Sequence, residues 1–257
     1  MLSQLSYTPT GREQLQYNMM AGVGELLGRV FGSGGKSPLQ KRMRADWDQR
    51  ARANARYFVN TEKDNWTEEE FFTSGEQTVA EEVLSDMTNI CQGQDPRQMR
   101  ILEIGCGVGR VTRALAGVFG EVHALDVSKQ MIRQARKNLK GLPNVRLHVN
   151  NGADLSVLPN KLMFDFAFSC IVFQHIPSRE VIENYIREVH RVLRPGRLFK
   201  FQVQGYLDIE TSPDDTWRGI PFTEEQIVAT GERCGFEPRH RYGAGTQYFW
   251  QWFFKRP

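Results

Sequence analysis

The stretch that decides the fold reads Arg100-Ile-Leu-Glu-Ile-Gly-Cys-Gly-Val-Gly109. Its first five residues form a short apolar run that ends at glycines, a pattern typical of a buried strand entering a tight turn. The glycines let the chain turn sharply and bring its backbone against a ligand at the N-terminus of the next helix. The stretch therefore predicts a ligand-binding unit of strand, loop and helix.

Strands and helices alternate from this loop to the end of the chain. A helix is predicted at 178–193, stopped by Pro195-Gly196, and a capping box of Thr223 and Gln226 opens a later one. Ser128 is the predicted N-cap of the helix that follows the second strand. The predicted strands cover 100–104, 121–127, 144–149, 164–173, 197–203, 236–242 and 247–254. Strand runs that are apolar on both faces predict an α/β fold, with a mostly parallel sheet between layers of helices.

An acidic residue marks the end of the second predicted strand. Asp126 lies 21 residues beyond Gly105, where a carboxylate accepts hydrogen bonds from the hydroxyl pair of a ribose. A dinucleotide fingerprint needs a glycine at position 110, and this chain has Arg110 there. The two features together predict an adenosine-containing ligand and weaken the interpretation as a nicotinamide dinucleotide site.

Further motifs occur in a fixed order along this region, and each follows a predicted strand or helix. They are Glu103-x-Gly-x-Gly-x-Gly109, Asp126, Asn151-Gly-Ala-Asp154, Phe164-Asp-Phe-Ala-Phe-Ser-Cys170 and Leu193-Arg-Pro-Gly196. With them the chain resembles the class I, Rossmann-fold S-adenosylmethionine-dependent methyltransferases of the type 11/25 kind, from Arg100 to about Val203. The resemblance implies a Rossmann-like three-layer sandwich with a seven-stranded, mostly parallel sheet whose last strand is antiparallel.

The resemblance also implies the cofactor, S-adenosylmethionine, with S-adenosylhomocysteine as product, and a set of contacts to it. Glu103 and the loop backbone would face the methionine part, Asp126 the ribose, Asp154 the adenine amino group and Met131 the adenine ring. The full implied set is Glu103, Gly105, Cys106, Gly107, Gly109, Asp126, Val127, Met131, Ala153, Asp154 and Cys170. Structural alternatives stay open: Glu103 orders the loop, Asp154 caps a turn, Met131 is core, and Cys106 fills the loop.

The acceptor side offers one titratable candidate, His175, just past the fourth strand. A base there would remove the proton of an acidic acceptor, but the favoured alternative is that this histidine holds the turn before Pro177 or packs on the cofactor without proton transfer. Gln174 is a second candidate at this position, where it would orient the acceptor without taking a proton. Aromatic residues before the first strand and after the fifth are candidates for a lid over the acceptor, with packing as the alternative: Trp47, Tyr57, Trp66, Phe72 and Trp217.

Three regions are expected: a flexible N-terminal arm at 1–37, a helical lid at 38–95 and the methyltransferase domain at 96–257. The arm is glycine-rich, and a membrane-surface helix at 19–31 is an alternative for part of it. The polar N-terminus gives no export signal, and the four scattered cysteines fit a reducing compartment, so a cytoplasmic location is expected. No stretch is apolar and long enough to span a membrane.

The expected activity is methyl transfer to a small-molecule acceptor through oxygen, nitrogen or carbon. The net charge of +3 demands no polyanionic partner, and the Asn/Asp-Pro-Pro-Tyr/Phe motif of nucleic-acid amino methyltransferases does not follow the fourth strand. No histidine or cysteine spacing predicts a metal site. Two alternatives stay open: a protein or RNA substrate reached through the basic first 60 residues, and a regulator that binds the cofactor without turnover.

Overall fold

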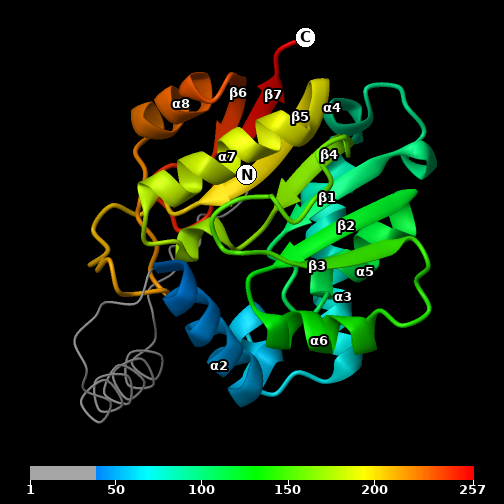
Figure 1. Ribbon diagram of the computed structural model, residues 1–257, viewed down its shortest axis with the longest axis vertical. Helices are drawn as coiled ribbons and strands as arrows, with labels where there is room; N and C mark the ends of the chain where they lie inside the picture. The colour runs from blue at the N-terminus through cyan, green and yellow to red at the C-terminus, as the bar shows by residue number, and fades with distance from the viewer. Residues whose placement is uncertain (1–38) are drawn as a thin grey trace, which may run out of the picture. The chain divides into compact units, whose positions relative to one another are not determined.

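A seven-stranded sheet forms the centre of the described part of this computed structural model, which covers residues 39–257 (Figure 1). The strands are β1 (Arg100–Ile104), β2 (Glu121–Asp126), β3 (Val145–Val149), β4 (Phe164–Ser169), β5 (Leu193–Val203), β6 (Phe236–Tyr242) and β7 (Phe249–Lys255). Their order is β3-β2-β1-β4-β5-β7-β6, and β7 pairs antiparallel with both of its neighbours. The sheet confirms the predicted Rossmann-like architecture.

Helices cover both faces of this sheet. They are α2 (Leu39–Val59), α3 (Glu68–Glu82), α4 (Met87–Cys91), α5 (Arg110–Val118), α6 (Lys129–Asn138), α7 (Arg179–Val192) and α8 (Glu224–Arg233). Ile186 of α7 and Ile227 of α8 pack against Phe201 on one face. On the other face, Val79 of α3, Leu115 of α5 and Ile132 of α6 belong to a second buried cluster. Because side chains alternate along each strand, both faces of the sheet become core.

The predicted helix starts agree with the structure. The Ser128 hydroxyl accepts a hydrogen bond from the Met131 N–H at 3.0 Å, and Thr223 forms the expected capping box with Gln226. A second capping box, of Thr67 and Glu70, opens α3. These local motifs form because the first N–H groups of a helix have no partner within the helix.

Two strand boundaries differ from the prediction by four residues, and the others agree within two. β4 ends at Ser169, and the chain then forms a short 3₁₀ turn at Phe173–His175, although the apolar run continues to Phe173. β5 begins at Leu193 and includes Pro195 and Gly196, beside a register shift in its pairing with β4. The run past Ser169 is apolar because it lines a pocket, so periodicity could not separate it from the strand.

The chain divides into two compact units, Met1–Ser37 and Pro38–Pro257, and the second holds the sheet. The flexible arm predicted at 1–37 and the surface helix at 19–31 lie outside the described residues. Within residues 39–257, no helix combines the length and the apolar character that crossing a bilayer requires.

Candidate functional site

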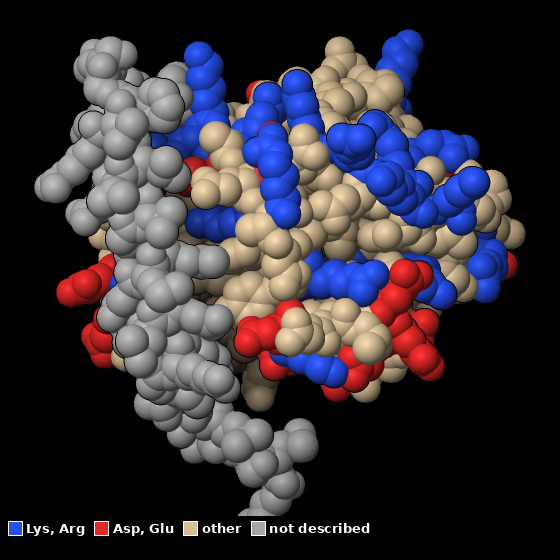
Figure 2. All heavy atoms as spheres, turned by 90° about the horizontal axis from the view of Figure 1, so that it is seen from below, with Lys and Arg blue, Asp and Glu red and all other residues tan. Residues whose placement is uncertain are grey.

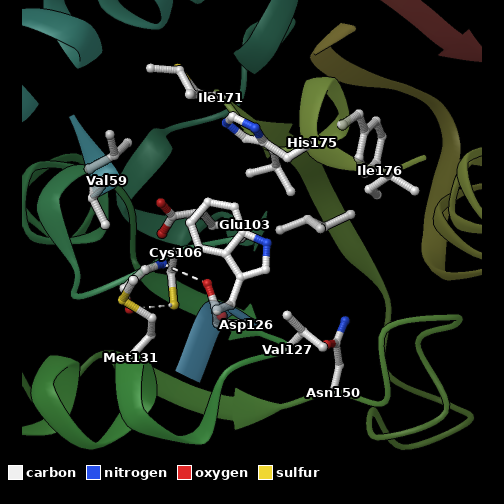
Figure 3. A pocket seen from close by; sticks show the side chains of 18 of the residues that line it. Val59, Glu103, Cys106, Asp126, Val127, Met131, Asn150, Ile171, His175 and Ile176 are labelled. Carbon is white, nitrogen blue, oxygen red and sulfur yellow. Dashed lines mark hydrogen bonds between the residues drawn. The ribbon is translucent and has the colours of Figure 1, made fainter. Parts of the chain in front are cut away.

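One pocket lies at the carboxyl ends of β1, β2 and β4, and residues of α2 contribute to its wall. Figure 3 shows the carboxylates of Glu103 and Asp126 directed into it, between Met131 on one side and His175 on the opposite side. In an open α/β sheet, ligands bind at this edge, where neighbouring strands connect to helices on opposite faces. The pocket therefore lies where the fold class places a ligand.

The glycine loop after β1 forms the floor of the pocket. Gly105 has φ +77° and Gly107 has φ +54°, in the left-handed region that favours glycine. A Cβ added at Gly105 would lie 2.2 Å from Val172 Cγ2, and one added at Gly107 would lie 2.7 Å from Val59 Cγ2. The loop backbone thus lies open to a ligand only because side chains are absent at these positions.

Asp126 connects the ends of β1 and β2 through its carboxylate. One oxygen accepts a hydrogen bond from the Gly107 N–H at 2.9 Å, and the other accepts from the Ser128 N–H at 2.8 Å. Burial raises the pKa of Asp126 to about 6, against the lowering effect of these bonds. A carboxylate oxygen accepts more than one hydrogen bond, so both oxygens keep capacity for hydroxyl groups of a ligand.

Glu103 is the second carboxyl group in the pocket, at the end of β1. Its Oε2 accepts a hydrogen bond from the Thr112 hydroxyl at 2.6 Å, and only 4% of the side chain is exposed. Burial raises the pKa of Glu103 to about 7. A cationic group of a ligand would strongly stabilise the ionised carboxylate in this position, because little water is present to screen their attraction.

Two buried polar atoms that line the pocket have no hydrogen-bond partner in the described structure: Asn150 Oδ1 and Arg110 Nε. The Asn150 side-chain N–H donates to the Tyr185 hydroxyl at 2.7 Å, so the amide is oriented and its oxygen is left as an acceptor. Arg110 donates through Nη1 to the Ser74 carbonyl at 2.9 Å. Buried polar groups are normally satisfied, so these atoms indicate a missing ligand or water.

Polar side chains fasten α2 over the pocket. Arg44 donates to the backbone carbonyls of Val127 and Asn150, at 3.2 and 2.6 Å. Asp48 accepts from the Ser128 hydroxyl at 2.6 Å and from the Gln130 N–H at 3.0 Å. These contacts join residues 80 or more positions apart, and they attach α2 to the same loop ends that carry Asp126 and Asn150.

An aromatic cluster surrounds His175 on the side of the pocket opposite Met131 (Figure 3). The ring centroid of His175 lies 4.8 Å from that of Trp217 and 5.3 Å from that of Trp47, and Phe58 packs edge-on against Trp217 at 5.7 Å. The Arg50 guanidinium lies 4.8 Å from the Trp47 centroid and 5.2 Å from that of Trp217. Trp47 and Phe58 line the pocket, whereas Trp217 supports it from behind.

His175 is held as a neutral imidazole. Its Nδ1 contacts the Trp217 carbonyl, which only accepts, so the proton lies on Nδ1 and Nε2 carries the lone pair. Gln174 Nε2 lies 3.4 Å from His175 Nε2, and the Gln174 oxygen accepts from Gln202 at 3.0 Å. Burial lowers the pKa of His175 to about 4. This side chain is a hydrogen-bond acceptor at neutral pH and a weak base.

The structure brings most of the predicted residues together. Of the predicted set, the pocket lining contains Trp47, Glu103, Gly105, Cys106, Gly107, Asp126, Val127, Met131, Cys170 and His175. Burial raises the pKa of the Cys106 and Cys170 thiols, so neither is a thiolate nucleophile at neutral pH.

Eight predicted residues lie outside the lining: Tyr57, Trp66, Phe72, Gly109, Ala153, Asp154, Gln174 and Trp217. Asp154 instead caps a turn, accepting from the Asn151 side chain at 2.8 Å and from the Ser156 N–H at 2.9 Å. Trp66 and Phe72 pack with Phe71 in a buried cluster that also contains Met131 of the pocket wall.

Sequence reasoning missed several lining residues: Met43, Phe58, Val59, Arg110, Asn150, Ile171, Val172, Ile176 and Tyr185. Two signals were available for some of them. Asn150 directly follows the third strand, at the edge where ligands bind, and Ile171 to Ile176 continue an apolar run beyond the fourth. The α2 residues gave no such signal, because helical spacing is the same for core and pocket.

Comparison with known proteins supports the same family. Residues 101–196 match a family model described as a methyltransferase domain. The chain is 31% identical over 127 residues to malonyl-[acyl-carrier protein] O-methyltransferase of Enterobacter lignolyticus, an alignment that covers 48% of this chain and 46% of that protein. It is 27% identical over 174 residues to 24-methylenesterol C-methyltransferase 3 of Arabidopsis thaliana, covering 62% and 46%. The chain thus spans under half the length of these two curated relatives.

Solved structures share the fold. Magnesium protoporphyrin IX methyltransferase from Synechocystis PCC 6803, determined with bound S-adenosylmethionine, superposes with a TM-score of 0.62 at 15% identity, over 87% of this chain and all of that one. The matched domain model, the sheet order and the glycine loop agree with the motifs. The chain therefore carries a methyltransferase domain at residues 101–196, within a sheet that has the fold of class I, S-adenosylmethionine-dependent methyltransferases.

Proposed function

We propose that this protein transfers the methyl group of S-adenosylmethionine to a small organic acceptor and releases S-adenosylhomocysteine. One observation carries the proposal: the glycine loop, two buried carboxyls and the free Asn150 oxygen converge on one pocket whose remaining wall is mostly apolar. The residues present fit the cofactor, because the loop leaves room only where glycines lie and the pocket holds unpartnered polar atoms.

In this proposal each end of the cofactor has its own partner. Asp126 accepts from the ribose hydroxyls, and the Glu103 carboxylate attracts the methionine ammonium group. Asn150 Oδ1 accepts from the adenine amino group, while Val127 and Met131 pack on the ring. The bound cofactor supplies a methyl group on a positively charged sulfur.

Asn150→Ala is expected to weaken S-adenosylhomocysteine binding about tenfold, because one hydrogen bond to a buried acceptor is lost. Asp154→Ala is the matched comparison, since Asp154 lies outside the pocket and is expected to change affinity less than threefold. Isothermal titration calorimetry measures both, and thermal unfolding checks that the loss of the Tyr185 contact leaves the variant folded. A larger loss in Asp154→Ala would return the adenine contact to that residue.

The acceptor side favours a small, largely apolar molecule. Met43, Phe58 and Ile176 line this part of the pocket, and Trp47 lies over His175. Side chains of this kind exclude water and hold an acceptor in line with the methyl group, which supplies much of the rate enhancement in a displacement reaction. The names of the relatives, which include sterol and porphyrin methyltransferases, support organic acceptors.

In this proposal His175 orients the acceptor by accepting a hydrogen bond at Nε2, which replaces the 3.4 Å contact of that nitrogen with Gln174 Nε2. His175→Ala is expected to raise the KM for the acceptor about tenfold, because a hydrogen bond to the acceptor is lost. The affinity for S-adenosylhomocysteine should stay within twofold, because the ring makes no hydrogen bond to Glu103 or Asp126, the carboxyl groups assigned to the cofactor. The activity of the native protein should show no histidine titration between pH 5.5 and 8, since the His175 pKa is about 4. At saturating S-adenosylmethionine, an activity step near pH 6.5 that disappears in His175→Ala would contradict this neutral, orienting role.

The proposed function is tested by transfer of radiolabelled methyl from S-adenosylmethionine into a cell extract of the source organism, separated into small molecules, protein and RNA. Label in the small-molecule fraction is the expected result. Label confined to protein or RNA would overturn the small acceptor, and tight cofactor binding without any label would indicate a non-catalytic binding protein.

A further inference from the structure

Four basic side chains lie on the outer face of α6 and a fifth lies in the turn just after it, and we call the five the α6 strip: Lys129, Arg133, Arg136, Lys137 and Lys140. All five are exposed, while Met131, Ile132 and Ala135 on the opposite side of the helix are buried. The burial pattern fixes which face looks outward, because residues three and four apart share a helix face.

No acidic residue offsets this charge locally. The sequence from 127 to 153 contains six Lys or Arg and no Asp or Glu. Within residues 39–257, no ion pair involves a member of the α6 strip. Asp48 packs against α6, but its carboxylate is committed to the Ser128 hydroxyl and the Gln130 N–H at the start of the helix.

The surrounding surface has the same character. Figure 2 views the end of the molecule where α2 and α6 lie in Figure 1, and it shows many Lys and Arg side chains, with acidic side chains gathered toward one edge. Arg52 of α2 is exposed next to Ala51, whose carbonyl accepts from Gln134 of α6 at 2.8 Å. The basic surface therefore continues from α6 onto α2.

The α6 strip lacks the features of two other kinds of interface. Surfaces that bind a specific protein partner contain buried aromatic or apolar anchor residues and few lysines. Surfaces that bind single-stranded nucleic acids contain aromatic rings on which the bases stack. The outward positions of α6 hold only Lys and Arg, with Gln and Asn at their edge. An anionic lipid membrane is fluid, so binding to it requires no anchor residue and no fixed geometry. Clusters of four to eight Lys or Arg residues on one helix are typical of such binding.

We propose that the α6 strip docks this protein on membranes rich in anionic phospholipids. The pocket lies on the other side of this helix, because Val127, just before α6, and Met131, on its buried face, line it. Docking through α6 brings the pocket close to a phase in which apolar acceptors dissolve. The association itself depends on charge alone and does not require methyl transfer.

The test is sedimentation of the full chain with vesicles. Vesicles of about 40% phosphatidylglycerol in phosphatidylcholine are compared with phosphatidylcholine alone, at low and high salt. We expect binding to the anionic vesicles only, and release by about 0.5 M salt. Each cation near such a surface adds about fivefold to partitioning, so the variant Arg133→Gln, Arg136→Gln, Lys137→Gln, Lys140→Gln should lose at least about tenfold.

A control variant carries the same charge change on other elements: Arg97→Gln, Lys161→Gln, Arg239→Gln and Arg256→Gln, all at exposed positions. It should bind anionic vesicles within about threefold of the native protein, and thermal unfolding checks both variants. The proposal is overturned by absent vesicle binding, by equal losses in the two variants, or by full retention in the α6 variant. Strip-dependent binding to single-stranded RNA that exceeds vesicle binding at equal salt would also overturn it.

Discussion

Asp126→Ala is expected to weaken S-adenosylhomocysteine binding by about a hundredfold or more. The proposal gives the carboxylate two ribose hydroxyls, and hydrogen bonds to a charged group contribute about 1.5 to 3 kcal/mol each. The same carboxylate holds the Gly107 and Ser128 N–H groups, so the variant also loosens the glycine loop that the cofactor contacts. Isothermal titration calorimetry measures the change.

Asp126→Asn is the matched variant for this measurement. Its amide keeps one acceptor oxygen and nearly the same volume, so it should retain part of the affinity, between the native protein and Asp126→Ala. Thermal unfolding without ligand shows how much of the loss comes from the loop. Unchanged affinity in Asp126→Ala would refute the ribose assignment.

S-adenosylhomocysteine affinity should rise as pH increases from 5 to 8, with most of the change near pH 7. Glu103 has a pKa of about 7 in the free protein, so at pH 5 the proton must leave before the carboxylate can pair with the ligand ammonium group. A group with that pKa costs about tenfold in affinity for each pH unit well below 7. Calorimetry in two buffers of different ionisation enthalpy would also detect the released proton.

The stability of the free protein should move in the opposite direction. The folded-state pKa of Glu103 lies above its ordinary value of 4.5, so its contribution to the free energy of unfolding is fully present below about pH 4.5 and is lost as pH rises through 7. The thermal shift caused by ligand should therefore grow with pH. Glu103→Gln removes the group that titrates near pH 7, so the affinity profile should become shallower and keep only the part that Asp126, with a pKa of about 6, contributes. A profile that keeps its slope in Glu103→Gln would assign the titration to another group.

Several parts of the site were predictable from short stretches of sequence. The glycine loop, the first strand and Asp126 are each defined by neighbours within a few residues, through apolar periodicity, backbone freedom and the position of an acid at a strand end. The capping residues Ser128 and Thr223 were predictable for the same reason, because an N-cap acts on the N–H groups two or three residues ahead.

The roof and the adenine end of the pocket depended on distant contacts instead. Asp154 has the motif position of an adenine partner, yet its carboxylate binds its own turn, while Asn150 holds a free acceptor oriented by Tyr185. Arg44 and Asp48 reach loop ends 80 or more residues away. None of these pairings produces a repeating pattern in the sequence from which it could have been predicted.

Ordered motifs in the sequence were enough to predict the methyltransferase domain, and local backbone preferences were enough to predict the succession of strands and helices. The glycine loop and Asp126, which we assign to the cofactor, were found in the same way. Only the tertiary structure decided which side chains enclose the pocket, that α2 covers it, and that His175 is neutral and buried. Those properties arise from desolvation and from contacts between chain segments far apart in sequence, which no short stretch of residues encodes.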